Sequence, residues 1–512
     1  MAKKKINDVI QVKFFDLNLN EIELAITPTR LIKLETKSKN YIKPVDFLSP
    51  TDTKAIKQWT IDITQTLSEN WISQTTVLPH FIKAVGLDLC VLLETLKIAD
   101  LVLTRIIEKY KCKDIFIVTE QMPLNNMLQY ESHGHQYVEL LQNHKWSSLK
   151  KVKVHINKSE QKSINGNEKV FSPSLIRVVY YYLRTWYNLI TKLKISILKG
   201  IAIKLGFKSP PIPSILLSQN KDNNSLLKLS KTISLSDYLF LFNNPSEKII
   251  SVFKNKLLTN IKSIFFDDSN SNINFLLYND ILVKRMTDFI NKRNDLLGAY
   301  LKLKDFKDSR FLNLILPSAI GCGIDAWSSL AIEEENGFVA SSQHGSGYGN
   351  SYHPMMIFSD TRFNYFFTYS SPINSPTYKF AQQNSNAKWE TIGSCHLHHI
   401  RENMTCAPKR VKKILYVMNL CVPFYSVNFP WEFILDQLRV LELINEFGEK
   451  YSIYVKKDHS NSVNEQDYPN LNFINSSPAD ILKDFDLLLI ESGVSTIVLE
   501  ALMTNKHIVI MT

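Results

Sequence analysis

The feature that most constrains the fold is an alternation of short apolar runs and amphipathic segments between residues 311 and 512. The runs LNLILPSA, FVASSQ, KILYVMN, YSIYVK and DLLLIES have the length of buried strands, and several are separated by segments with helical periodicity. Because the connections between them are short, the alternation predicts an α/β fold of parallel sheets with helices on both faces.

The alternation pauses at residues 394–410 and then restarts, which predicts two Rossmann-like doubly wound domains. We expect an N-terminal domain over residues 1–393, with a helical basic insertion at about 160–300. A linker at 394–410 and a C-terminal domain over 411–512 complete the expected organisation. The 512 residues are sufficient for two or three domains.

The last apolar run, HIVIM, lies at residues 507–511. Parallel sheets bury their strands on both faces. We therefore expect this run to be a central strand, and the C-terminal domain to be truncated or to continue beyond Thr512.

Two helices are expected to end at glycines. Gly337 follows a helical segment at 324–335, and Gly448 follows another at 431–447. A glycine after the last turn is a frequent C-cap. The periodicity also predicts a helix over 90–110 and a buried strand over 115–118.

Net charge and cysteine usage restrict the setting in which the chain works. The formal charge of +11 favours anionic partners, whereas the six cysteines form no CxxC pair and indicate free thiols in a reducing compartment. No apolar window is long enough to span a bilayer. We expect a cytoplasmic protein, and we expect no nucleic-acid partner because no helix-turn-helix, RRM or zinc-finger signature is present.

The segment at 169–221 contains nine Lys or Arg and no carboxylate, with aromatic residues at Tyr180–Tyr182 and Trp186. A basic, aromatic and amphipathic segment is typical of peripheral contact with an anionic membrane, here the inner face of the cytoplasmic membrane. The alternative is an ordinary helix that covers the sheet and exposes a basic face to solvent.

The first candidate site is a glycine-rich loop after the run FVASS, at the strand end where open α/β sheets bind ligands. His344 could act as a general base toward a hydroxyl, with Gln343 orienting groups beside it. The alternative is a tight turn with a structural histidine. The acceptor side of the candidate site comprises Gly345, Gly347, Tyr348 and Gly349.

Two more candidate sites follow strands of the C-terminal domain. Lys456, Lys457 and His459 could neutralise a phosphate leaving group, or form a solvated basic loop. Further along, a helix is expected to begin at Ser495 and Thr496, where free N–H groups attract phosphate, and Glu500 lies one turn later. Alternatively, Ser495 only caps the helix and Glu500 is a surface residue.

These motifs, in the order QHG, V-K-x-x-H and the stretch from Asp486 to Ala501, resemble the GT-B glycosyltransferases. The resemblance covers about residues 311–512, and residues 1–300 match nothing nameable. It is closest to bacterial surface-carbohydrate transferases: capsule and lipopolysaccharide Kdo transferases, CDP-glycerol glycerophosphotransferases and O-antigen-cluster transferases. It implies two domains facing a cleft and a metal-independent enzyme without a cofactor.

The resemblance also implies roles for the candidate residues. His344 would face a glycan or lipid-linked glycan acceptor. The donor, a nucleotide-activated sugar for which the resemblance suggests a CMP-linked sugar or CDP-glycerol, would contact Lys456 or Lys457, His459, Ser492, Ser495, Thr496 and Glu500. The family's K-P-H-P element is Lys457-Asp458-His459-Ser460 here, so which lysine points inward stays open. The alternatives are a glycerophosphotransferase and a non-catalytic anion- or nucleic-acid-binding relative.

A zinc site was the remaining candidate. Cys395, His396, His398, His399 and Cys406 cluster in the expected linker. Their spacing fits no standard zinc module. We therefore predict no metal site.

Overall fold

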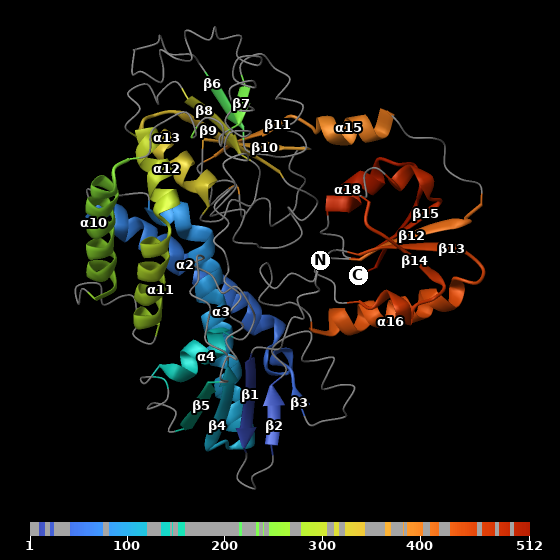
Figure 1. Cartoon of the computed structure of the whole chain (residues 1–512), viewed down its shortest axis with the longest axis horizontal. Helices are drawn as coiled ribbons and strands as arrows, with labels where there is room; N and C mark the ends of the chain where they lie inside the picture. The colour runs from blue at the N-terminus through green and yellow to red at the C-terminus, as the bar shows by residue number, and fades with distance from the viewer. Residues whose placement is uncertain are drawn as a thin grey trace, which may run out of the picture.

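The computed structural model describes residues 10–15, 21–24, 41–74, 81–119, 135–143, 146, 152–158, 214–217, 232–234, 239, 245–266, 278–304, 312–316, 323–343, 364–369, 382, 387–402, 410–418, 431–457, 463–476, 481–491 and 496–511. These residues form three β-sheets and a layer of helices (Figure 1). The α/β class with parallel sheets that the sequence predicts is confirmed.

The N-terminal sheet, sheet A, is mixed and has the strand order β3-β2-β1-β4-β5. Its central strand β1 is antiparallel to both β2 and β4, and Val12 is paired with Leu24 on one side and Ile117 on the other. Val12 and Phe14 are fully buried, whereas the side chains between them face away from this core, as strand periodicity requires. The strands are β1 Ile10–Phe15, β2 Glu21–Leu24, β3 Tyr41–Ile42, β4 Asp114–Thr119 and β5 Lys153–Lys158.

A layer of helices packs around α3, a helix of 30 residues. Figure 1 shows α3 running from sheet A toward α12 and α13. Its buried residues, including Leu92, Leu96 and Leu103, belong to one hydrophobic core that continues into α11, α12, α13 and β9. The helices are η1 Pro44–Phe47, α2 Pro50–Gln74, α3 Phe81–Tyr110, α4 His135–Gln142, α10 Glu247–Phe266, α11 Asn279–Lys292, α12 Asn294–Lys304 and α13 Ile324–Glu334.

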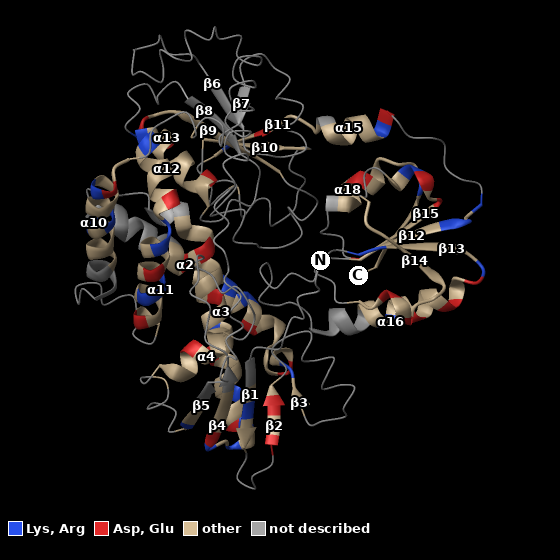
Figure 2. Ribbon diagram, viewed as in Figure 1, with Lys and Arg blue, Asp and Glu red and all other residues tan. Residues whose placement is uncertain are grey.

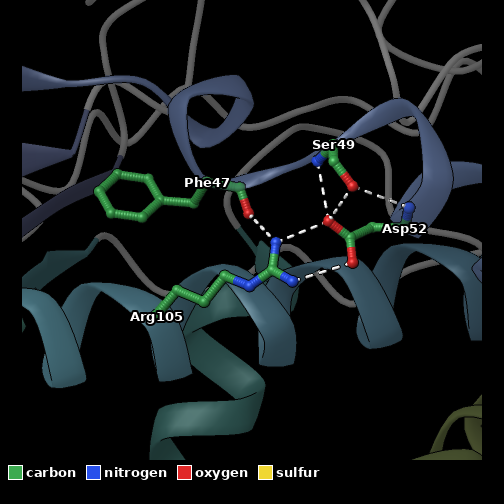
Figure 3. A network of polar contacts seen from close by, with 4 residues as sticks. All are labelled: Phe47, Ser49, Asp52 and Arg105. Carbon is green, nitrogen blue, oxygen red and sulfur yellow. Dashed lines mark hydrogen bonds and ion pairs between the residues drawn. The ribbon is translucent and has the colours of Figure 1, made fainter.

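A polar network fixes the start of α2 to α3 (Figure 3). Ser49 and Asp52 form a capping box, in which the Ser49 hydroxyl accepts the Asp52 N–H and the Asp52 carboxylate accepts the Ser49 N–H. Arg105 of α3 donates two hydrogen bonds to the same carboxylate, at 2.6 and 2.9 Å, and one to the Phe47 carbonyl at 2.7 Å. Its guanidinium is the main cause of a pKa of Asp52 well below the usual range.

Sheet B is parallel throughout its described strands, in the order β11-β10-β9-β8-β6-β7. The predicted helix before β9 is confirmed as α13, but its cap is not the expected glycine. Asn336 adopts the left-handed conformation, with φ +61°, and the Gly337 N–H donates to the Ile332 carbonyl in a Schellman motif. The strands are β6 Ser214–Leu217, β7 Thr232–Ser234, β8 Leu312–Leu316, β9 Phe338–Ser342, β10 Tyr365–Thr368 and β11 Lys388–Thr391.

Sheet C is also parallel throughout, in the order β14-β13-β12-β15-β16. Helix α16 covers one face and α18 the other (Figure 1), and each face has its own hydrophobic cluster. The elements are β12 Lys413–Val417, α16 Trp431–Phe447, β13 Ser452–Lys456, η5 Glu465–Asp467, β14 Leu471–Ile474, η6 Leu482–Asp484, β15 Leu487–Glu491, α18 Thr496–Leu502 and β16 His507–Met511.

Within the C-terminal domain as described, the run at 507–511, for which a central position is expected, is the last strand of its sheet. β16 lies at the edge of sheet C, and its side chains Val509 and Ile510 are 47% and 38% exposed. A continuous apolar run is typical of a central strand, and the sequence alone does not reveal that these side chains face solvent.

Gly448 does follow α16, as predicted, yet a close contact also favours glycine there. A Cβ at this position would lie 2.4 Å from the backbone oxygen of Asn470. Asn445 of α16 holds that segment in place, because its side chain accepts the Asn470 N–H at 3.0 Å and its carbonyl accepts the Asn470 amide at 3.1 Å.

The described residues contain one sheet more than the two that the sequence predicts. Five strands between residues 10 and 158 form sheet A, so the described part of the expected first domain at 1–393 contains two sheets with different topologies. Strands β6 and β7, which fall inside the expected insertion at about 160–300, pair into sheet B. The expected linker at 394–410 contains a helix, α15 Cys395–Glu402.

The length and hydropathy of the described helices bear on whether the chain could cross a membrane. None of them combines the length and the apolar character that crossing a bilayer requires.

Candidate functional site

At the carboxyl end of sheet B, Gln343 follows β9 directly and is 5% exposed. Its N–H donates to the Phe367 carbonyl at 2.8 Å, and its side-chain Oε1 accepts the Tyr369 N–H at 3.0 Å. Gln343 therefore ties the end of β9 to the end of β10. The predicted acceptor residues His344, Gly345, Gly347, Tyr348 and Gly349 lie outside the described residues.

At the carboxyl end of β13, the two candidate lysines face opposite sides of sheet C. Lys456 is in register with Val417 and Ile474, which belong to the cluster beneath α18. Lys457 lies over the ring of Phe473, on the side of α16, at 5.6 Å from the ring centroid. Because paired residues of neighbouring strands point to the same face, Lys456 is the lysine on the side of α18.

The partners of the two lysines differ as well. Lys457 forms an ion pair with Glu465, whereas the Lys456 ammonium donates to the Lys457 carbonyl at 3.2 Å. Lys456 thus has no carboxylate partner among the described residues, and its charge is the better placed of the two to bind an added anion. His459, the third member of this predicted group, lies outside the described residues.

Helix α18 begins at Thr496, close to the predicted start. Ser492 and Ser495 lie outside the described residues. Glu500 is 3% exposed, so it is not the surface residue of the alternative interpretation. A buried carboxylate requires hydrogen-bonding partners.

The partner of Glu500 is His396 of α15. The His396 Nε2 atom lies 2.8 Å from Glu500 Oε1, although the two residues are 104 positions apart. His396 comes shortly after β11, the edge strand of sheet B, and Glu500 lies in the helix that follows β15 of sheet C. This hydrogen bond therefore connects the carboxyl end of sheet B with the carboxyl end of sheet C.

A second buried carboxylate, that of Glu491, lies at the end of β15. The sequence predicts no function for this residue. Glu491 is 4% exposed and accepts a hydrogen bond from the Gln437 side chain of α16 at 2.5 Å. Glu491 is part of the apolar run that predicts β15, but Gln437 carries no sequence signal for this contact. The pair fixes α16 to the carboxyl end of the sheet.

Asp486, the first residue of the family-like stretch, lies at the opposite end of sheet C. Its carboxylate accepts the backbone N–H groups of Lys412 and Lys413, both at 2.9 Å. These bonds lower the pKa of Asp486, the Lys413 N–H most of all. Asp486 therefore anchors the start of β12 and lies away from the candidate site.

The histidine-rich segment pairs with glutamates instead of forming a cluster. His396 contacts Glu500, and His398 contacts Glu402 one turn away at 3.1 Å. In the described part of the chain, no three His, Cys, Asp or Glu side chains are grouped so that they could hold a metal ion. Of the cysteines, Cys90 and Cys112 are buried free thiols, and burial raises the pKa of Cys90 to about 12.

Of the basic segment at 169–221, the structure describes only residues 214–217, which form β6 inside sheet B. The predicted membrane contact therefore lies outside the described residues.

The described residues define an α/β chain with two parallel sheets, whose carboxyl ends carry polar residues and are joined by the His396–Glu500 hydrogen bond. Comparisons with known proteins found no matching family model, no matching curated protein and no matching solved structure.

Proposed function

We propose that this chain is a glycosyltransferase that moves a sugar from a nucleotide-activated donor to a surface polysaccharide or lipopolysaccharide acceptor. The observation that carries the proposal is the His396–Glu500 contact, which brings the carboxyl ends of two parallel sheets together. Ligands of open α/β sheets bind at such ends. A donor held by one sheet and an acceptor held by the other would meet there.

The donor side of the proposal rests on Lys456 and α18. The two lie on the same face of sheet C, and Lys456 has no carboxylate partner within the described part. A cation at this position would stabilise the charge that develops on a departing nucleotide phosphate. The proposal needs no metal ion, because the Lys456 ammonium and the free N–H groups at the start of α18 would supply the positive charge.

In the proposed reaction, an acceptor hydroxyl oxygen attacks the anomeric carbon of the donor sugar. The bond between that carbon and the phosphate oxygen breaks, and the nucleotide leaves with the electron pair. The hydroxyl proton passes to a base, for which His344 is the candidate from the sequence. Gln343, tied to Tyr369, would fix the start of the loop that carries this histidine.

The charge distribution favours this proposal over nucleic-acid binding. Acidic and basic residues are interspersed on α11 (Figure 2), which carries Asp280, Lys284, Asp288 and Lys292 outside its buried face. A face with both signs of charge is a poor match for a phosphate backbone, which requires a basic stripe.

A thermal-shift screen against CMP, CDP, UDP and GDP tests the proposal. A nucleotide present at about 100 times its Kd stabilises a protein by about 2.7 kcal/mol, which raises the Tm by several degrees. We expect one nucleotide to give such a shift. If none of the four nucleotides changes the Tm, the proposal is wrong.

A matched pair of lysine variants locates the donor site. Lys456→Gln should weaken binding of the stabilising nucleotide about tenfold, because one charge-assisted contact is lost. Lys483→Gln removes an equal charge from η6, at the amino end of β15, and should leave the affinity unchanged. Equal affinities for the two variants would place the donor elsewhere.

A further inference from the structure

Helix α15 docks against α18 through one of its faces. His396 and Ile400 lie one turn apart on this face, and Ile400 is 5% exposed. His398 and Glu402 lie on the outer face, where their side chains are 70% and 62% exposed. The eight residues of α15 thus form a small amphipathic cover that makes a polar contact with α18 through His396 and Glu500.

The docked helix encloses the Glu500 carboxylate. Glu500 is 3% exposed and His396 is 23% exposed, so the histidine is the solvent-accessible member of the pair. The His396 ring supplies one of the hydrogen bonds that a buried carboxylate requires. Adjacent hydroxyl groups of a ribose would supply O–H donors of the same kind to the same oxygens.

The chain enters α15 through one glycine in an unusual conformation. The Ile392 N–H still donates to the Thr368 carbonyl of sheet B at 3.0 Å, whereas Ser394 already accepts the Leu397 N–H at the start of α15. Between them, Gly393 has φ +74°, in the left-handed region that glycine adopts without strain. A rotation at this residue would move α15 while leaving β11 in place.

We propose that α15 is a lid over the donor site and that His396 and the ribose hydroxyls of the donor exchange places on Glu500. The inference rests on the proposed function, because it takes Glu500 as a donor-binding residue. Without donor, His396 holds α15 closed over Glu500. Donor binding replaces the histidine with ribose hydroxyls, and α15 leaves its seat on α18.

The lid proposal and a purely positioning role for His396 predict opposite changes in nucleotide affinity when the ring is removed. If His396 competes with the donor, removing its ring should tighten nucleotide binding, by about 10-fold or more for the loss of one hydrogen bond to a charged group. If His396 only orients Glu500, removing the ring should weaken binding. The sign of the change therefore decides between the two roles.

The experiment compares His396→Ala, His396→Gln and His398→Ala, with Kd measured by calorimetry for CMP, CDP, UDP and GDP. We expect His396→Ala to tighten binding and His396→Gln, which keeps an N–H donor, to stay near the wild type. His398→Ala makes the same change on the outer face of α15 and should leave the Kd unchanged. Weaker or unaltered binding by His396→Ala overturns the lid.

Hydrogen–deuterium exchange of residues 395–402 provides a readout that does not depend on affinity. In the wild type, adding the nucleotide that binds should accelerate exchange in α15, because the lid leaves α18. Slower or unchanged exchange overturns the proposal. His396→Ala should show the faster exchange without any nucleotide.

The outcomes separate the lid from the function. If the wild type binds a nucleotide and His396→Ala binds it with the same Kd, the lid proposal is wrong and the transferase proposal stands. Binding by His396→Ala alone supports both. If neither protein binds any of the four nucleotides, the proposed function fails and the lid fails with it.

Discussion

The helical layer around α3 and sheet C use their polar side chains differently. Around α3, such groups join helices that are distant in the sequence: Arg285 of α11 binds Glu139 of α4, and Tyr278 donates to Asp100 of α3. In sheet C, polar groups lie at strand ends, where Asp486 anchors one end and Lys456 lies at the other. The first arrangement holds helices together, and the second leaves one end of the sheet available to a ligand.

The difference follows from how each region is organised. Sheet C orders its helices by strand succession, because each parallel strand leads into the next through a crossover on a defined face. The helices around α3 have no such constraint, and one continuous core connects them to both sheet A and α13. Specific buried pairs then help to select one helix arrangement among several that bury similar apolar area.

The largest expected effect comes from breaking the pair between α4 and α11. The side chains of Arg285 and Glu139 are 7% and 10% exposed. Arg285→Met leaves the Glu139 carboxylate without its guanidinium, and removing one partner of a buried pair costs about 3 to 5 kcal/mol. Chemical unfolding measures the loss.

A double variant checks that the cost comes from the stranded charge. Arg285→Met with Glu139→Leu replaces the pair by apolar side chains and should recover most of the stability. A loss below about 1 kcal/mol in the single variant would show that the pair does not organise the helices.

Acid should separate the two regions. Burial, with a smaller contribution from Arg285, lowers the pKa of His135 in α4 to about 4. Unfolded histidine titrates near 6.5, so the unfolded chain binds the proton more readily. The contribution of His135 is complete above about pH 6.5 and is lost as the pH falls to about 4, up to about 3 kcal/mol.

Asp486 belongs to the other region, sheet C, and loses its contribution to stability at lower pH than His135 does. Its pKa is lowered from 3.8, so its contribution persists above that value and is lost only as the pH falls further. Hydrogen exchange, corrected for its intrinsic pH dependence, should therefore show opening around α4 between pH 6.5 and 4 while sheet C stays protected. Opening of sheet C first would contradict the assignment, and His135→Asn should remove the first step.

The same substitution at two glycines should have opposite signs. Gly448→Ala places a Cβ against the backbone of Asn470, and overpacking of this kind costs about 2 kcal/mol. Gly298, inside α12, has no atom within 4 Å of the added Cβ, so Gly298→Ala should stabilise by about 1 kcal/mol through higher helix propensity. Thermal unfolding measures both, and equal signs would refute the comparison.

The sequence predicts sheet C better than it predicts sheet A and the helices around α3. The helix at 431–447 and the strands of sheet C follow from apolar periodicity, because each element there has one core-facing side. The edge position of β16 could not be predicted, since an apolar run has the same appearance at the edge as in the centre. The strand expected at 115–118 is confirmed as β4, but its pairing into sheet A was not predicted, because the central strand β1 lies about 100 residues earlier in the sequence.

The candidate site was predictable only in part. The position of Lys456 at a strand end follows from the sequence, and the alternation of side chains determines which lysine faces α18. The His396–Glu500 contact does not follow, because it joins residues 104 positions apart. The capping box of Ser49 and Asp52 does have a local signal, the S-x-x-D spacing, but its link to Arg105 depends on tertiary packing.

The smallest effect is expected at the amino end of sheet C. Asp486→Asn keeps the shape of the side chain but removes the charge that accepts the Lys412 and Lys413 N–H groups. Because this carboxylate is open to solvent, its loss should cost about 1 kcal/mol, less than a fully desolvated charge-assisted pair. Chemical unfolding at pH 7 measures the cost, which should shrink as the pH falls below 3.8. Nucleotide affinity should not change, because Asp486 lies at the end of the sheet away from Lys456. A weaker nucleotide complex in Asp486→Asn would mean that the two ends of sheet C are not separate in function.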